Sequence, residues 1–365
     1  MNRWELIVIG SGPSGLTAAI EAAKNKVKVL LIDENIKAGG QLFKQIHKFF
    51  GSSAHYSGIR GINIGENLIK KAEEVGVKVL LNRIAIGLFK DKKIVVKQGL
   101  DNKGKNIEIF EADKIVVASG ASENAIYFPG WTLPGVMNAG AVQTMINVHR
   151  VLPGKKILMV GSGNVGLIVS YQLIQAGAEV KAVIEALPKI GGYEVHADKI
   201  KRLGVPIYTS HTIVEAKGNL EVEKAVIAKV DKNWQTIPNT ERILKVDTIS
   251  VAAGLKPLIK LVRMADCKCI YIPELGGWVP IHNKNMETTY SGIYVAGDVT
   301  GVEEANTALE EGRLAGIAVA ESLGYLDKKI ACNIKTEIWE RLKDLRSGPF
   351  GENRFKAKNK IIREY

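Results

Sequence analysis

The sequence predicts an α/β protein built on two nucleotide-binding units, because one glycine-rich signature occurs in it twice. Each copy is a GxGxxG turn followed, 19 residues after its last glycine, by a glutamate. The residues are Gly10, Gly12, Gly15 and Glu34 in the first copy, and Gly161, Gly163, Gly166 and Glu185 in the second. Each turn follows a β-branched run and precedes a helix-compatible stretch. This order is that of a Rossmann-like, three-layer domain, so we expect two such domains.

Glycine is needed at each of the three positions of the turn for a different physical reason. The first permits the tight turn, the second lets a pyrophosphate approach the backbone, and the third lets helix and strand pack closely. The pyrophosphate then lies at a helix N-terminus, where N–H groups and the positive end of the helix dipole favour anions. We therefore expect contacts from the first helical residues, which are Pro13 and Ser14 in one copy and Asn164 and Val165 in the other.

The acid that follows the second strand of each unit would accept hydrogen bonds from ribose hydroxyls. Glu34 is the first choice in the first copy, and its neighbour Asp33 is the alternative. Glu185 takes this place in the second copy. An acid disfavours a 2′-phosphate, so Glu185 favours NAD(H) over NADP(H). Two nucleotides in one chain suggest hydride or electron-pair transfer between two cofactors.

Composition excludes several classes of protein. The 365 residues suggest two domains, and 46% hydrophobic content with 37 glycines suits a large α/β protein. No apolar run is long enough for a membrane span, and a first strand near Met1 leaves no room for a signal peptide. Three cysteines without CxxC spacing indicate no disulfide framework and no metal site, and favour a reducing cytoplasm.

The chain carries a net charge of +12. We interpret most of it as a lysine-rich solvated surface, with a share that attracts anionic cofactors and acidic redox partners. No basic stretch is interleaved with aromatic residues, so nucleic-acid binding is not expected. Residues 326–365 carry 11 Lys/Arg against 6 Asp/Glu, and we expect them to form a basic docking tail or a loosely held extension.

The remaining elements follow the hydrophobic pattern. We expect a helix over 65–76, a buried strand over 77–81, and short strands at 94–96 and 107–110 around a polar turn at 101–106. Apolar strands at 113–120, 246–254 and 289–298 each end in a glycine or a Gly-Asp pair. The helix after residue 298 has an apolar stripe that includes two glycines, which implies close packing on another backbone.

Four segments resemble the FAD-binding elements of the pyridine nucleotide-disulfide oxidoreductase superfamily, including the thioredoxin reductases, and occur in that superfamily's order. They are the first GxGxxG turn with its acid, the segment Gly39, Gly40, Gln41 and Leu42, the turn Ala118, Ser119 and Gly120, and the pair Gly297 and Asp298. The second GxGxxG unit lies between the third and fourth segments. Gly254 ends the last strand of this second unit, just as Gly120 ends the strand expected at 113–120.

The resemblance implies an NAD-type domain inserted into a discontinuous FAD-type domain. Its boundaries would be 1–122 and 257–325 for the FAD domain, 123–256 for the NAD domain with its linker, and 326–365 for the extension. FAD and NAD(H) would be the cofactors. Asp298 would hold the FAD ribitol, and a helix beginning near residue 302 would direct its N-terminus at the flavin. The ribose and pyrophosphate contacts alone do not distinguish FAD from another adenine nucleotide.

Three further segments resemble a narrower subgroup: residues 131–143, 275–280 and 311–316. That subgroup contains the larger subunits of hydrogen cyanide synthase, opine oxidase and dye-linked proline dehydrogenase, together with part of the alpha chain of sarcosine oxidase. The resemblance implies other dehydrogenase subunits as partners, namely a second flavin subunit with a small iron–sulfur subunit, or else a homo-oligomer. Substrate oxidation would then involve an amine, an amino acid such as proline, or a similar small metabolite.

The chain departs from these relatives at its cysteines. It lacks the redox CxxC or CxxxxC pair of disulfide reductases, which argues against disulfide reduction. Only Cys332 occurs where longer subgroup members hold a [2Fe–2S] centre, and one thiol cannot replace the usual four ligands. Cys267 and Cys269 are expected to be free thiols on opposite faces of a strand.

No side chain is a strong candidate for an acid or base, because the flavin itself would carry the chemistry. Lys44 and His47, which follow the Gly-Gly-Gln-Leu segment, are the weak candidates. The sequence therefore predicts an FAD- and NAD-dependent subunit of a multisubunit dehydrogenase. The alternatives are a stand-alone NAD(P)H-dependent flavin reductase acting on ferredoxin, a quinone or a dye, and a subunit that keeps a nucleotide only for structural reasons.

Overall fold

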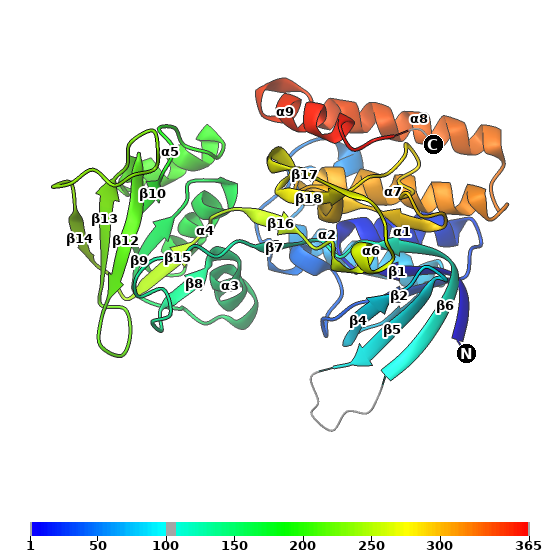
Figure 1. Cartoon of the computed structure of the whole chain (residues 1–365), viewed down its shortest axis with the longest axis horizontal. Helices are drawn as coiled ribbons and strands as arrows, with labels where there is room; N and C mark the ends of the chain where they lie inside the picture. The colour runs from blue at the N-terminus through cyan, green and yellow to red at the C-terminus, as the bar shows by residue number, and fades with distance from the viewer. Residues whose placement is uncertain (1, 100–106, 364–365) are drawn as a thin grey trace. The chain divides into compact units, whose positions relative to one another are not determined.

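The computed structural model describes residues 2–99 and 107–363, which fall in two compact units (Figure 1). One unit consists of Met1–Ser122 and Lys256–Tyr365, and the other of Glu123–Leu255. The chain thus leaves the first unit and later returns to it, through the short paired strands β7 (Ala121–Glu123) and β16 (Leu255–Pro257). The polar turn expected at 101–106 lies outside the described residues.

A sheet with the strand order β3-β2-β1-β6-β5-β4 forms the centre of the first unit. In addition, β19 pairs with the C-terminal end of β6. The parallel strands are β1 (Asn2–Ile9), β2 (Val29–Ile32), β3 (Lys78–Leu80), β6 (Ile107–Val117) and β19 (Ile293–Val295). The antiparallel strands are β4 (Arg83–Leu88) and β5 (Lys93–Gln98), which pair with each other and, through β5, with β6. The α/β class predicted from the sequence is confirmed.

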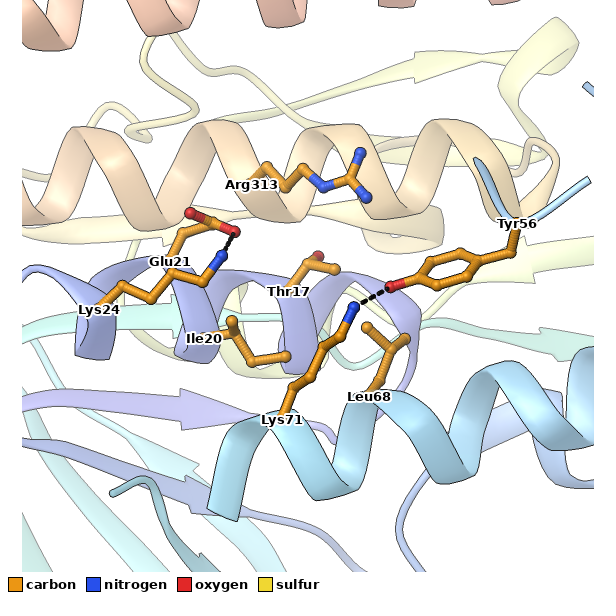
Figure 2. Close-up of a pocket in the computed structure, with 8 residues that line it drawn as sticks. All are labelled: Thr17, Ile20, Glu21, Lys24, Tyr56, Leu68, Lys71 and Arg313. Carbon is orange, nitrogen blue, oxygen red and sulfur yellow. Dashed lines mark hydrogen bonds and ion pairs between the residues drawn. The ribbon is translucent and has the colours of Figure 1, made fainter. Parts of the chain in front are cut away.

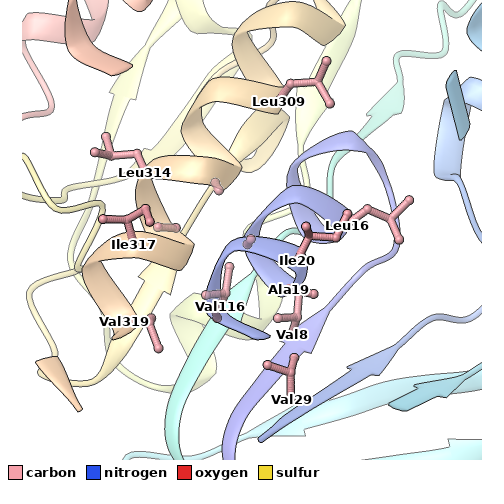
Figure 3. Close-up of a cluster of buried hydrophobic side chains, with 14 of the residues drawn as sticks. Val8, Leu16, Ala19, Ile20, Val29, Val116, Leu309, Leu314, Ile317 and Val319 are labelled. Carbon is pink, nitrogen blue, oxygen red and sulfur yellow. The ribbon is translucent and has the colours of Figure 1, made fainter. Parts of the chain in front are cut away.

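Helices α1 (Pro13–Lys24), α2 (Gly61–Glu74) and α7 (Ala305–Ser322) cover one face of this sheet. Figure 3 shows the apolar cluster between α1, α7 and the strands, which includes Leu16, Ile20 and Leu309. Cβ atoms at Gly312 and Gly316 would lie 2.1 and 2.4 Å from backbone oxygens of α1. The two glycines therefore let the helices touch, as the stripe in the sequence predicted.

Shorter elements complete the first unit. They are η1 (Gly40–Lys44), η2 (Ser53–His55), α6 (Lys260–Met264), β17 (Cys269–Ile272), η4 (Pro273–Leu275), β18 (Gly277–Pro280) and η5 (Gly297–Thr300). Helix α7 begins at Ala305 and not near residue 302, because η5 and an irregular segment separate it from β19.

The C-terminal segment forms two helices, α8 (Lys328–Leu345) and α9 (Gly348–Asn359). Helix α8 packs on α7 with Ile338 and Leu342 fully buried, and Ala357 of α9 joins an apolar cluster beside η4. The expectation of a loosely held extension is therefore wrong for the part of it that the structure describes. The prediction relied on the positive charge of this segment and overlooked the apolar residues that pack it against the rest of the unit.

The second unit repeats the parallel arrangement with the strand order β11-β10-β9-β15-β8. Its strands are β8 (Val136–Asn138), β9 (Lys156–Val160), β10 (Glu179–Glu185), β11 (Ile207–Thr209) and β15 (Thr248–Val251). An antiparallel sheet adds β12 (His211–Lys217), β13 (Lys224–Lys229) and β14 (Arg242–Lys245). The helices are α3 (Ala139–Thr144), the π-helical turn η3 (Met145–His149), α4 (Asn164–Gln175) and α5 (Glu194–Arg202).

Among the described residues, no helix combines the length and the apolar character needed to cross a bilayer.

Candidate functional site

The first glycine turn connects β1 to α1 and is shaped by contacts within the protein. Gly10 has a φ of +105°, and a Cβ there would lie 2.3 Å from the carbonyl oxygen of Ala118. A Cβ at Gly15 would lie 1.8 Å from the oxygen of Gly10. In contrast, a Cβ at Gly12 would have no heavy atom within 4 Å. The protein itself does not require glycine at 12, so the open space there is where a pyrophosphate can approach.

The four segments that resemble FAD-binding elements converge on this turn. Ala118 lies against Gly10, and a Cβ at Gly40 would be 2.7 Å from the Cα of Gly12. A Cβ at Gly297 would be 2.5 Å from Ser14 Oγ. These segments lie far apart in the sequence, yet each one approaches the N-terminus of α1. The arrangement leaves the backbone exposed to a ligand and fits the phosphate-binding part of a dinucleotide.

The two neighbouring acids after β2, Asp33 and Glu34, have different surroundings. Asp33 is buried, and its Oδ2 accepts hydrogen bonds from the N–H and the Oγ of Ser11 at 2.6 Å each. In the second unit, Glu185 Oε2 accepts the equivalent bonds from Ser162 at 3.0 and 2.8 Å. Glu34, which matches Glu185 by residue count, is exposed one position further along.

A β-bulge explains why Asp33, and not Glu34, is equivalent to Glu185 in the structure. Strand β10 shifts register between Val180 and Ala182, whereas β2 pairs with β1 without a shift. The bulge inserts one residue into the second copy, so equal spacing in sequence becomes unequal spacing in structure. Asp33, the alternative in the sequence analysis, is the structural equivalent of Glu185.

The second glycine turn has the same construction as the first. A Cβ at Gly161 would lie 2.3 Å from the oxygen of Ala252, and one at Gly166 would lie 2.1 Å from the oxygen of Gly161. A Cβ at Gly163 would again have no heavy atom within 4 Å. The second turn is therefore also open at its middle glycine and can receive a pyrophosphate of its own.

The cofactor-binding residues predicted around the second turn differ in their surroundings. Asn164 begins α4, and its Oδ1 accepts a hydrogen bond from Tyr193 N at 2.9 Å, while Val165 is exposed. Gly254 has a φ of +86° and its oxygen accepts a bond from Asn124 N. Gly192 N donates to the oxygen of Ser162 at 2.9 Å, just as Gly39 N donates to that of Ser11 at 3.0 Å.

Asp298 lies in η5, three residues after the end of β19, and is partly buried. Its Oδ1 has a long contact of 3.4 Å with Glu303 N. Burial raises the pKa of Asp298 to about 6, and the hydrogen bond from Glu303 only partly opposes this effect. A carboxylate with few internal donors is able to accept a hydrogen bond from a ligand hydroxyl.

Two buried acceptors that the sequence analysis missed lie in the neighbouring segments. Gln45 Oε1, just after η1, and Asn306 Oδ1, in the first turn of α7, have no hydrogen-bond partner among the described residues. A buried polar atom without a partner costs about 1–3 kcal/mol, so such atoms mark places where a ligand or water donates. Neither residue belongs to a glycine motif, which is why no signal in the sequence pointed to them.

The two weak candidates for a catalytic acid or base are Lys44 and His47. Lys44 is the last residue of η1, and Gln41 of the same turn is exposed. The ring of His47 stacks on Phe49 with centroids 6.0 Å apart. A different histidine, His55, is buried and contacts Glu310 at 3.0 Å. The catalytic role of Lys44 and of His47 stays a prediction.

Cys267, Cys269 and Cys332 are free thiols, and the described residues contain no group of three His, Cys, Asp or Glu side chains placed to hold a metal ion. The expectation that Cys267 and Cys269 point to opposite faces is wrong, because both pack against the same apolar cluster. Cys267 precedes β17, which begins at Cys269, and even within one strand side chains two residues apart would share a face. Burial raises the pKa of Cys269 to about 11, which keeps it a thiol.

A pocket of about 90 Å³ lies elsewhere, between α1, α2 and α7 (Figure 2). Its cations already have partners, since Lys24 pairs with Glu21 at 2.9 Å and Lys71 donates to the hydroxyl of Tyr56 at 3.3 Å. Sites for large ligands enclose about 300–1,000 Å³. None of the predicted cofactor-binding residues lines this pocket, so we do not assign it to the cofactor.

The family model for "Pyridine nucleotide-disulphide oxidoreductase" matches residues 4–312 of the chain. The chain belongs to this family. It is 26% identical over 336 residues to a subunit of opine oxidase from Agrobacterium tumefaciens, covering 88% of this chain and 66% of that protein. It is also 26% identical to hydrogen cyanide synthase subunit HcnB of Pseudomonas aeruginosa, over 86% of this chain and 70% of that protein. The chain thus spans about two thirds of these curated relatives.

Among solved structures, the chain is similar to L-proline dehydrogenase from P. horikoshii, with a TM-score of 0.69 and 24% identity over 94% of this chain and 59% of that one. This likeness shows the fold. The family inferred from the sequence motifs is therefore confirmed, the chain is similar to members of the narrower subgroup, and it is an oxidoreductase of the flavoprotein type.

Two substitutions distinguish the neighbouring acids after β2. We expect Asp33→Asn to weaken FAD binding about 10- to 100-fold, because it replaces a charge-assisted acceptor that also holds Ser11. Glu34→Gln should change the dissociation constant less than about twofold, because Glu34 is solvated. Titration of apoprotein with FAD, followed by flavin fluorescence, measures both. A larger effect at residue 34 than at residue 33 would contradict the assignment.

Proposed function

We propose that the chain is an FAD-dependent oxidoreductase subunit that transfers a hydride between NAD(H) and flavin. Its substrate-oxidising partner would act on an amine, an amino acid such as proline, or a similar small metabolite. One observation carries the proposal: the segments at residues 10–15, 39–40, 118 and 297 meet around a glycine with open space beside it. The second turn has the same open glycine, which supports a second nucleotide.

The cofactor, when bound, would supply the electron-pair chemistry at its isoalloxazine ring. The chain's residues would bind and orient it. Asp33, whose carboxylate accepts hydrogen bonds from Ser11 and Asn35, would hold the turn beside the ribose, and Asp298 would accept a hydrogen bond from the ribitol. The N-terminus of α7 would favour the negative charge of the reduced ring, because the positive end of a helix dipole lies there.

The names of the relatives support the assembly. The opine oxidase protein and the hydrogen cyanide synthase protein are each one subunit of an enzyme. We propose a similar heteromeric assembly here, with a second flavin subunit, a small iron–sulfur subunit, or both, in the cytoplasm. Only Cys332 occurs in residues 326–365, and a single thiol cannot supply the usual four ligands of an iron–sulfur centre.

A second candidate is a stand-alone NAD(P)H-dependent flavin reductase that passes electrons to ferredoxin, a quinone or a dye. The completeness of both glycine turns supports it too, because a flavin site and a nicotinamide site are what such a reductase needs. Glu185, whose carboxylate contacts Ser162 at the turn, favours NAD(H) over NADP(H) in either case.

Anaerobic titration with NADH tests the proposal. We expect the purified protein to show a flavin band near about 450 nm that bleaches on addition of NADH. Gly163→Val should keep the flavin band but slow its bleaching at least about 100-fold, because the branched side chain would fill the open space at the second turn.

Two other outcomes would contradict parts of the proposal. A flavin band that NADH leaves unchanged in the wild-type protein would remove the nicotinamide nucleotide from the reaction and indicate that a partner donates the electrons. A protein that neither carries nor binds flavin would contradict the proposed function and favour a structural role for the nucleotide fold.

A further inference from the structure

Four charged side chains are buried together beside η5, the turn that begins at Gly297. They are Glu303, Glu311, Arg346 and Lys358, and each is at most 4% exposed. Arg346 lies at the end of α8 and Lys358 lies in α9. Two positive and two negative charges balance one another, which is the condition under which buried ions are tolerated.

Glu311 connects the turn to the C-terminal helices. Its Oε2 accepts hydrogen bonds from Gly297 N and from Thr300 Oγ1, both at 2.9 Å. Its Oε1 accepts from Arg346 at 2.6 Å and from Lys358 at 2.7 Å. Burial alone would raise the pKa of Glu311, but the two cations overcome that effect and lower it to about 2. Glu311 is therefore a carboxylate that holds the backbone of the turn.

Lys358 contacts the same turn directly. Its ammonium donates to Thr300 Oγ1 at 2.5 Å as well as to Glu311, and it lies 3.4 Å from Glu303. A buried ammonium can satisfy its three donors only if its acceptors stay in place. The position of Lys358 and the conformation of η5 thus depend on each other.

We propose that Lys358 is a positioning residue of the cofactor site, which through its ion pair with Glu311 fixes the Gly297–Thr300 turn for FAD. The proposal rests on the proposed function, since it takes this turn as the place where the ribitol binds. The family model ends at residue 312, so α9 lies beyond the part of the chain that it matches. A C-terminal element thereby becomes part of the nucleotide-binding machinery.

Lys360 provides a matched control on the same segment. It is two residues away and carries the same charge, but its side chain is 55% exposed and pairs with Glu274 at the surface. Lys358→Met and Lys360→Met remove the same group, and only the first is expected to release the turn.

Hydrogen–deuterium exchange of the apoprotein tests the positioning without any cofactor. In Lys358→Met, we expect the amides of residues 296–301 to exchange at least about tenfold faster than in wild type, while in Lys360→Met they stay within about twofold. The dissociation constant for FAD should rise at least about tenfold in Lys358→Met only. Equal exchange of this segment in the two variants would overturn the proposal.

A second variant covers the case in which Lys358→Met does not fold. The double variant Lys358→Met/Glu311→Gln removes one charge of each sign, so Glu303 and Arg346 remain as a neutral pair. The new amide side chain at position 311 can still accept from Gly297 N through its carbonyl oxygen. Because the double variant lacks the Lys358–Glu311 ion pair, exchange of residues 296–301 at least about tenfold faster than in wild type in the folded protein supports the proposal, and exchange within about threefold of wild type overturns it.

The proposed function and the role of Lys358 fail under different results. If wild-type apoprotein binds no FAD, the proposed function fails whatever the exchange data show. If FAD binds equally to wild type, Lys358→Met and Lys360→Met, the proposed function stands and the role of Lys358 is overturned.

Discussion

Glu311→Gln should lower the free energy of unfolding by about 3–5 kcal/mol, because it leaves two buried cations with only Glu303 as a counter-ion. The neutral amide is nearly isosteric, so the loss comes from charge and not from a cavity. Urea denaturation at neutral pH, followed by circular dichroism, measures the change. Glu337→Gln on the exposed side of α8 is the control and should change stability by less than about 0.5 kcal/mol.

The same substitution should alter the response to acid. Glu311 has a folded-state pKa of about 2, below its ordinary value of 4.5, so its stabilisation is present above pH 4.5 and is lost as the pH falls toward 2. In Glu311→Gln that loss is absent, and stability should depend less on pH in this window. A Glu311→Gln protein with wild-type stability at pH 7 and a wild-type acid profile would show that the buried cluster contributes nothing.

Gly12→Val should abolish FAD binding, with a rise of at least about 100-fold in the dissociation constant, while the protein remains folded. The Cβ position at residue 12 faces open space, and its backbone is extended, with φ of −70° and ψ of −176°. Valine is compatible with that conformation, so the unfolding free energy should change by no more than about 1 kcal/mol. The side chain instead occupies the space that the pyrophosphate needs.

Gly15→Ala gives the complementary result. A Cβ at residue 15 would lie 1.8 Å from the oxygen of Gly10, so helix and strand must separate to admit even one methyl group. We expect this variant to lose stability by about 1–3 kcal/mol as well as FAD affinity. Parallel measurement of thermal unfolding and FAD affinity distinguishes the two positions. Undiminished FAD affinity in Gly12→Val would place the nucleotide elsewhere.

Features that depend on local chemistry could be predicted from the amino-acid sequence. Glycines at fixed spacing between a buried strand and a helix specify a βα turn, and the turns at Gly10 and Gly161 have the expected form. The order of motifs along the chain also predicted the family, which the comparison confirms. Such motifs can be found in the sequence because each one lies within about 30 residues of chain.

Features that depend on register and on distant partners emerged only in the folded chain. The bulge between Val180 and Ala182 makes Asp33, and not Glu34, the counterpart of Glu185. No residue type in the sequence indicates that such a bulge is present. The positive residues Arg346 and Lys358 looked like part of a solvated tail in the sequence. Their acceptor Glu311 lies 35 and 47 residues earlier in the chain, so only folding shows that their charges are buried and paired.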